Sequence, residues 1–125
     1  MTPVPSTGSE PAGDVPRETP RIRLARLAVD AAASCPGVAG LDRGTGDRWS
    51  TRVGTERLPG VVVIADGDPG TYGVTVHVRA RLTDLHVLAD DVRHAVRAAA
   101  GSAGLDDHLG EIRIAITDID DGSGA

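Results

Sequence analysis

Hydrophobic residues in the second half of the chain follow two clear periods. In residues 85–99, apolar side chains recur every three or four positions, which is the spacing of one face of a helix. In residues 74–81 and 112–117, apolar and polar residues alternate, as they do in strands with one buried face. Thr83 or Asp84 would cap the helix. The pattern predicts a strand, a helix and a second strand parallel to the first or to a near neighbour.

The first half of the chain adds one helix and two strands. Residues 21–33 are rich in alanine and leucine and stop before Pro36-Gly37, so we expect a helix there. Residues 49–53 alternate like a half-buried strand, and residues 60–65 form a short apolar run. Dense turn residues at 66–70 would reverse the chain into a hairpin with residues 74–81.

The predicted fold is a two-layer α+β domain in the order helix, three strands, helix, strand. Each helix has one apolar face, so both should cover the same side of a small mixed sheet and leave its other face open. Residues 21–120 would form this single domain. Residues 1–20 carry five prolines among polar residues and predict a disordered, proline-rich tail, and residues 121–125 predict a flexible acidic and glycine-containing end.

Composition and charge indicate a soluble protein with a neutral body. The chain is 40% hydrophobic and 25% charged, and its longest apolar run, residues 61–65, is too short to cross a membrane. No basic residue precedes Arg17, so we expect no secretory signal and a cytoplasmic protein. The net charge of −5 comes from the two ends of the chain, since twelve arginines balance twelve acids between Arg21 and Arg113. A neutral body argues against non-specific nucleic-acid binding.

Three side chains on the second predicted helix have a spacing that could suit a metal. His86, Asp90 and His94 are four residues apart, but this face of the helix lies away from the apolar stripe. We therefore expect a solvated face with Asp90 paired to His94 rather than a zinc site. The acidic segments 66–68 and 118–121 lack the number of ligands that a calcium loop requires.

The single cysteine, Cys35, cannot form an internal disulfide, and we expect it to be a buried and unreactive thiol. The residues thus predict no catalytic group, no metal and no cofactor. A small metal-dependent or thiol enzyme stays open as an alternative.

A second alternative is a nucleic-acid-binding domain of the KH type. Gly37-Val38-Ala39-Gly40 matches the Gly-x-x-Gly loop with which such domains hold a nucleotide backbone, and it follows a helix. The two residues between the glycines are apolar, whereas phosphate contact favours arginine or lysine. The competing interpretation is a helix C-cap followed by a packed turn.

The open sheet face holds the candidate interaction site. Alternation puts polar side chains of two strands on the side that the helices leave uncovered: Thr75, His77, Arg79, Arg81, Arg113 and Thr117. Arginine is favoured where carboxylates of a partner are held in two places at once, so this face could be a docking surface as well as a solvated one. The only tryptophan, Trp49, lies on a neighbouring strand, and we expect it in the core.

Five segments, taken in order, resemble the alkaline shock protein family of bacterial envelope stress-response proteins. They are an alanine-rich helix and turn (residues 31–41), a central hairpin (58–63 and 74–80), a second helix (88–96) and a closing strand with an acidic end (112–120).

The resemblance implies a non-enzymatic cytoplasmic protein without a small-molecule substrate. It also implies a protein that self-associates, gathers at the membrane by binding a small membrane-anchored partner, and supports the cell envelope under stress.

Overall fold

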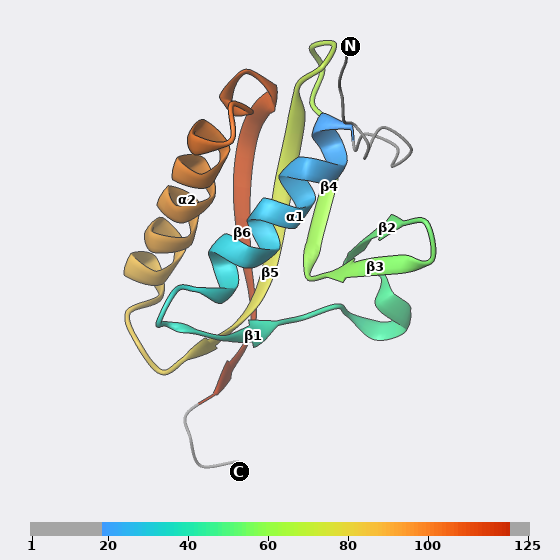
Figure 1. Cartoon of the computed structure of the whole chain (residues 1–125). Coiled ribbons are helices and arrows are strands. Elements are labelled where there is room, and N and C mark those ends of the chain that lie inside the picture. The colour runs from blue at the N-terminus through green and yellow to red at the C-terminus, as the bar shows by residue number, and fades with distance from the viewer. Residues whose placement is uncertain (1–18, 121–125) are drawn as a thin grey trace, which may run out of the picture.

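The computed structural model describes residues 19–120, which form two helices and six strands (Figure 1). In chain order these are α1 (Pro20–Ala33), β1 (Val38–Leu41), β2 (Ser50–Val53), β3 (Glu56–Pro59), β4 (Val61–Ala65), β5 (Tyr72–Arg81), α2 (Leu85–Ser102) and β6 (Leu109–Asp120). Most of the predicted tail and the predicted flexible end lie outside the described residues. Thr19 and Pro20 do not belong to a tail, because Thr19 caps α1 and Pro20 is its first residue.

Strand β5 is the centre of the main sheet. One edge of β5 pairs with β6 in parallel along most of its length. The other edge is shared, since β4 pairs antiparallel with residues 72–76 of β5, and β1 pairs antiparallel with residues 78–80. Strands β2 and β3 form a separate antiparallel hairpin. The prediction that the last strand runs parallel to the strand at residues 74–81 is confirmed.

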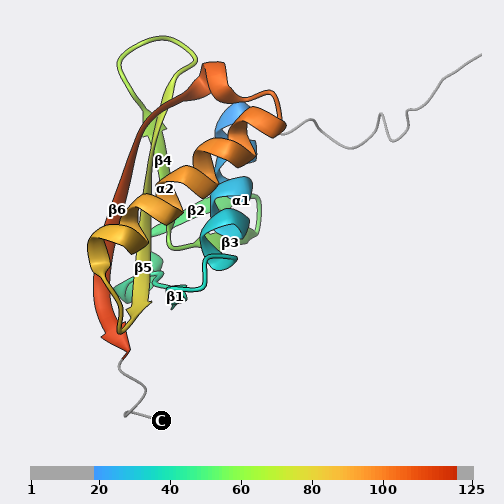
Figure 2. The same ribbon diagram turned by 90° about the vertical axis from the view of Figure 1, so that its left-hand side faces the viewer.

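Both helices lie on the same side of the main sheet (Figure 2), so the predicted two-layer α+β fold is confirmed. Helix α1 packs its fully buried alanines against the sheet, and their small size lets the helix come close to the strands. Strand β5 presents a row of buried aliphatic side chains toward the helices: Val74, Val76, Val78 and Ala80. Asp84 caps α2, as expected, by accepting hydrogen bonds from the backbone N–H groups of His86 and Val87.

Two short strands were not expected. Strand β1 occupies the segment interpreted as a turn, because the glycines there permit close packing rather than a reversal. A Cβ on Gly37 would lie 2.8 Å from Leu88 Cδ1, and one on Gly40 would lie 2.7 Å from the Arg79 guanidinium. Strand β3 carries two charged residues and a proline, so nothing in its own pattern predicts a strand. It exists because it pairs with β2.

A β-bulge shapes the end of β6. The register runs from Val78 opposite Ile116 to Arg79 opposite Asp118, which leaves Thr117 as the extra residue on β6. After the bulge, the side chains of β6 lie on the opposite face from the one that regular alternation would give them. Asp118 and Asp120 therefore share a face with Arg79 and Arg81, and Ile119 turns toward the helix side.

Candidate protein-interaction face

The sheet face turned away from α1 and α2, called here the reverse face, carries the six predicted site residues on β5 and β6. Thr75 stands directly opposite Arg113 across the β5–β6 pair, and His77 stands opposite Ala115. Arg79 and Arg81 continue the same face along β5. The structure thus brings the six candidates onto one side of two neighbouring strands, with Thr117 at the bulge.

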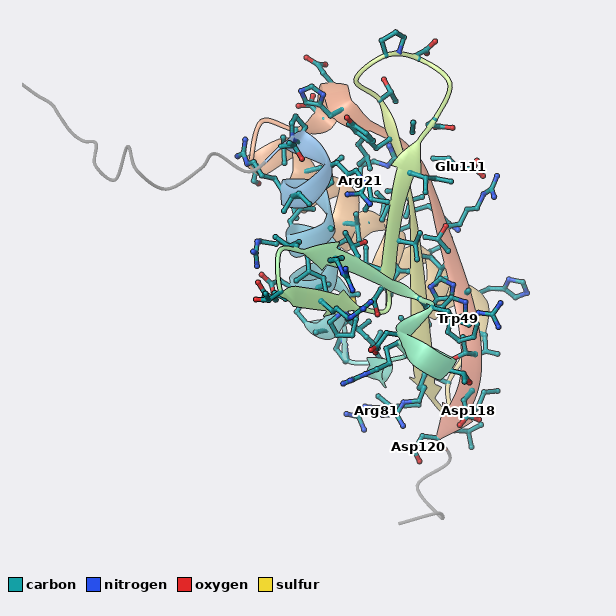
Figure 3. The ribbon with its side chains drawn as sticks, turned by 90° about the vertical axis from the view of Figure 1, so that its right-hand side faces the viewer. Arg21, Trp49, Arg81, Glu111, Asp118 and Asp120 are labelled. Atoms are coloured by element: carbon teal, nitrogen blue, oxygen red, sulfur yellow. The ribbon has the colours of Figure 1, made fainter. Side chains whose placement is uncertain are left out.

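The reverse face is not fully open, which corrects the expectation from the sequence. The Trp49 ring stacks on the His77 ring with 4.5 Å between centroids and 6° between planes. His77 is consequently only 9% exposed. Trp49 itself is half-buried and lies on the outside of the sheet, between Glu111 at one end and Arg81 with the two aspartates at the other (Figure 3). The covered middle divides the face into two exposed ends.

Burial controls the ionisation of His77. It lowers the pKa of this imidazole below its ordinary value of 6.5, although hydrogen bonding with the Gly60 backbone and the charge of Asp42 act in the opposite direction. The Nδ1 atom of His77 is buried and has no hydrogen-bond partner among residues 19–120. A neutral histidine is the form that suits this setting.

Asp42 links the loop after β1 to the bulge of β6. Its carboxylate accepts hydrogen bonds from Gly44 N–H at 2.9 Å and from the Thr117 hydroxyl at 2.8 Å. These bonds, the Gly44 bond first, lower the pKa of Asp42, and the charges of Arg79 and His77 add to the effect. Asp42 is therefore a fixed negative charge beside the covered middle of the face.

One exposed end of the reverse face carries side chains of both charge signs. Arg79 and Arg81 on β5 stand in register with Asp118 and Asp120 on β6, and all four residues are exposed. Arg81 also donates from Nε to the Pro36 carbonyl at 3.0 Å, which fixes its guanidinium near β1. This end is a mixed-charge patch, because the bulge adds two aspartates to the arginines that the sequence predicted on this face.

The other end lies near the β4–β5 turn. Arg113 forms an exposed ion pair with Glu111 at 3.1 Å, which lowers the pKa of Glu111 and raises that of Arg113. Asp66 reaches across Gly73 to accept a hydrogen bond from Glu111 N–H at 3.2 Å. A shallow hollow of about 60 Å³ separates these groups from the exposed side chain of Ile64. Arg113 is thus already engaged within the chain.

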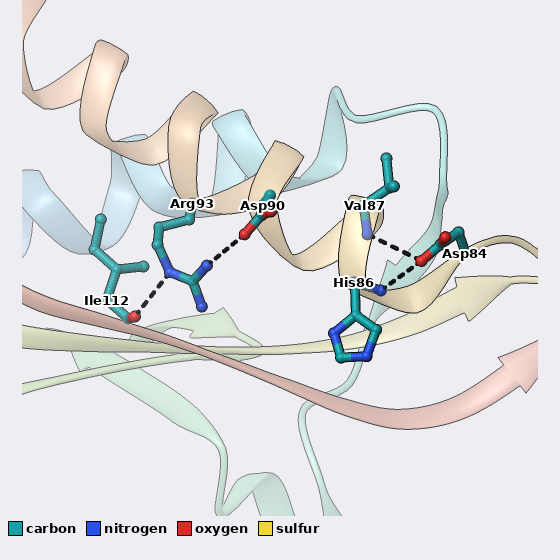
Figure 4. A network of polar contacts seen from close by, with 6 residues as sticks. All are labelled: Asp84, His86, Val87, Asp90, Arg93 and Ile112. Carbon is teal, nitrogen blue, oxygen red and sulfur yellow. Dashed lines mark hydrogen bonds and ion pairs between the residues drawn. The ribbon is translucent and has the colours of Figure 1, made fainter.

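The possible metal ligands on α2 lie apart from this face. His86, Asp90 and His94 are all exposed. Asp90 pairs with Arg93 at 3.0 Å rather than with His94, and Arg93 also donates to the Ile112 carbonyl of β6 (Figure 4). Within residues 19–120, no three side chains of the histidine, cysteine, aspartate or glutamate type gather closely enough to hold a metal ion.

The remaining two candidates are part of the packed fold. Cys35 is buried, and burial, followed by the charge of Asp91, raises the pKa of its thiol. The Gly37–Gly40 segment is strand backbone, because Val38 and Gly40 pair with β5 and the Gly37 carbonyl accepts from Arg81 N–H at 2.8 Å.

Sequence reasoning missed Trp49, Asp42 and the two aspartates as parts of this face. Alternation placed Trp49 on a strand, and no local signal shows that its ring packs on His77 of β5. The aspartates change face only because of the bulge at Thr117. The one usable signal was the glycine pair at Gly44 and Gly46, which marks a loop able to fold back over the sheet.

No protein-family model matches the chain, and no curated protein or solved structure matches it either. Among the described residues, neither helix combines the length and the apolar character needed to cross a membrane.

Proposed function

We propose that the chain is a non-enzymatic protein-interaction module that self-associates through the reverse face of its sheet. In this proposal it acts in the envelope stress response on the cytoplasmic side of the membrane. A small membrane-anchored protein would hold it there. The occupant of the reverse face is a second copy of the same chain.

The observation that supports self-association is the mixed-charge patch. Arg79 and Arg81 stand beside Asp118 and Asp120 on neighbouring strands, so a copy related by a two-fold axis can place its arginines against these aspartates and its aspartates against these arginines. Arginine and carboxylate form paired hydrogen bonds of fixed geometry, which suits such a contact. A surface of one charge sign would instead repel its own copy.

The envelope role comes from the resemblance to alkaline shock proteins. The resemblance depends on the order of a helix, a hairpin, a second helix and a closing strand with an acidic end. The described residues contain these elements in that order. The order supports the proposal without identifying the partner at the membrane.

Sedimentation velocity tests the interaction face. We expect the protein to assemble as its concentration rises, and Arg79→Glu combined with Arg113→Glu to abolish assembly while circular dichroism stays unchanged. Arg97→Glu is the matched control, because Arg97 is exposed on α2 and away from the sheet. Unchanged assembly of the double variant would refute this placement, and a wild-type protein that stays monomeric at every concentration would refute self-association.

A further inference from the structure

The segment that covers the middle of the reverse face is a loop with one aromatic side chain at its end. Residues 43–49, called here the Trp49 flap, lead from β1 to β2. The flap is held at its two ends by backbone hydrogen bonds, from Asp42 N–H to the His77 carbonyl at 2.9 Å and from Gly60 N–H to the Trp49 carbonyl at 2.6 Å. Between these anchors, Trp49 stacks on His77, Asp47 forms an ion pair with Arg57 of β3 at 3.8 Å, and Gly44 N–H donates to Asp42.

Two buried polar atoms near Trp49 lack a hydrogen-bond partner in the described part of the chain. His77 Nδ1 and Ser50 Oγ are both buried without a hydrogen-bond partner among residues 19–120, and both belong to residues next to Trp49 in the stack or in the chain. Because the His77 ring lies under the indole, its Nδ1 would gain hydrogen bonds with water if the indole moved away, and this opposes the closed arrangement. The closed arrangement of the flap therefore carries a local free-energy cost.

The backbone of the flap stores further strain. Asp47 has a φ of 60°, in the left-handed region that favours glycine. Gly44 has a φ of 75°, and a Cβ there would lie 2.9 Å from two atoms of the indole ring. Gly46 has a similar φ of 66°, but its Cβ would meet nothing within 4 Å. A Cβ on Gly44 would also lie 2.7 Å from Arg48 Cγ, and the two glycines differ in ψ, which is 171° at Gly44 and 26° at Gly46.

We propose that the Trp49 flap is a pH-dependent cover of the interaction face: neutral His77 holds the indole ring in place, and protonation of His77 releases it. Opening would uncover the middle of the reverse face between the two exposed ends. The effect on assembly rests on the proposed function. The opening itself does not.

The charged groups near His77 come from β5, from the end of β1 and from the flap. On β5 itself, Arg79 is the next residue on the same face, and from the end of β1 the Asp42 carboxylate approaches. From the flap, the Arg48 guanidinium lies over the Trp49 ring at 6.0 Å. The neighbours on β6 and β4, namely Ala115, Thr117 and Gly60, carry no charge. Burial opposes protonation of the ring, whereas hydrogen bonding with the Gly60 backbone and the charge of Asp42 favour it.

The sign of the pH dependence follows from these groups. Burial keeps the pKa of His77 in the closed flap below 6.5, and exposure to water in the open flap would restore the ordinary value. Between these two pKa values the open flap binds a proton that the closed flap does not. The ratio of open to closed flap therefore rises about tenfold for each pH unit of acidification across this window. Above this window the ratio no longer depends on pH.

Trp49 fluorescence tests the flap directly, because Trp49 is the only tryptophan in the chain. We expect its emission to shift to longer wavelength as the pH falls below 6.5, while far-ultraviolet circular dichroism stays constant. His77→Phe keeps an aromatic ring under Trp49 but cannot titrate, so the shift should disappear. An unchanged emission, a shift that His77→Phe retains, or a loss of circular dichroism at the same pH would each overturn the proposal.

Two glycine variants test the flap without altering His77. Gly44→Ala should shift the emission at neutral pH, because the new methyl group displaces the indole. Gly46→Ala also places a Cβ at positive φ, with a smaller backbone cost because ψ is 26°, and its Cβ meets nothing within 4 Å, so it should keep the emission of the wild type. If the two variants had the same emission, the close approach of the Trp49 ring to Gly44 would be refuted.

Sedimentation velocity at neutral and at mildly acidic pH tests whether opening of the flap changes assembly through the interaction face. We expect assembly of the wild type to strengthen on acidification and assembly of His77→Phe to be independent of pH in this range. A fluorescence shift without any change in sedimentation would overturn the role of the flap as a cover. The Arg79 and Arg113 variants test the interaction face independently of the flap.

Discussion

The hydroxyl of Thr51 should anchor the β2–β3 hairpin to the main sheet. Thr51 is 1% exposed, and its Oγ1 donates to the Val61 carbonyl of β4 at 2.7 Å. This carbonyl points away from β5, because the preceding carbonyl, that of Gly60, accepts from His77 N–H on β5. Without Thr51 it would be a buried acceptor at the edge of the sheet. Thr51→Val removes the donor and keeps the shape of the side chain.

The expected cost of Thr51→Val follows from the loss of this one bond. A buried carbonyl that loses its partner destabilises a protein by about 1 to 3 kcal/mol. The free energy of unfolding of a small domain is about 5 to 15 kcal/mol, so the loss is a measurable fraction of the total. Thr51→Ser keeps the hydroxyl and loses one methyl group, which should cost about 1 kcal/mol. The two variants therefore separate the hydrogen bond from the packing.

Urea unfolding at neutral pH, followed by Trp49 fluorescence and by circular dichroism, measures both costs. We expect Thr51→Val to lower the midpoint without changing the dependence on urea concentration. Because Trp49 lies two residues before Thr51, the folded emission of Thr51→Val also reports on the seat of the ring. A free energy of unfolding within about 0.5 kcal/mol of the wild type would refute the role of the hydroxyl as anchor.

Two further pairs of variants test the packing of the fold. Leu88→Ala should lower the free energy of unfolding by about 2 to 5 kcal/mol, because Leu88 is 2% exposed and lies against Gly37, just before β1. Val87→Ala, at a residue 53% exposed, should change it by less than about 0.5 kcal/mol. Equal losses in urea unfolding would contradict the orientation of α2. Gly60→Ala should cost clearly more than Gly54→Ala. Both residues have positive φ, which alone costs about 1 kcal/mol, but a Cβ on Gly60 would also lie 2.7 Å from Leu41 Cβ. Thermal unfolding measures both losses of stability, and a larger loss for Gly54→Ala would contradict the close packing of Leu41 against Gly60.

The central part of the fold could be predicted because local pattern and tertiary environment agree there. The strict alternation from Val74 to Ala80 reflects a strand with helices on one side, and the structure buries those same side chains. Asp84 caps α2 because a carboxylate at this position satisfies N–H groups that a helix leaves unpaired. Neither feature needs information from distant parts of the chain.

The features that were missed depend on contacts between distant segments. Strand β1 contains Gly40 and directly follows Gly37, and its pairing with β5 decides its structure in place of its own propensity. The bulge at Thr117 arises where the β5–β6 ladder shifts register, and it decides which face the acidic end occupies. The stack of Trp49 on His77 joins residues 28 positions apart in the sequence, so alternation along either strand cannot reveal it. Sequence reasoning therefore found the arginines of the face. It missed the tryptophan ring that covers the middle of the face and the two aspartates that stand beside the arginines.

A mixing experiment tests self-association through the reverse face most directly. Arg79→Glu makes its mixed-charge patch acidic, and Asp118→Arg makes the same patch basic, so each variant should remain monomeric in sedimentation velocity. An equimolar mixture should assemble, because the acidic patch of one variant then faces the basic patch of the other. Assembly in the mixture alone is the predicted result. Variants that assemble separately as the wild type does, or a mixture that stays monomeric while the wild type assembles, would contradict the account.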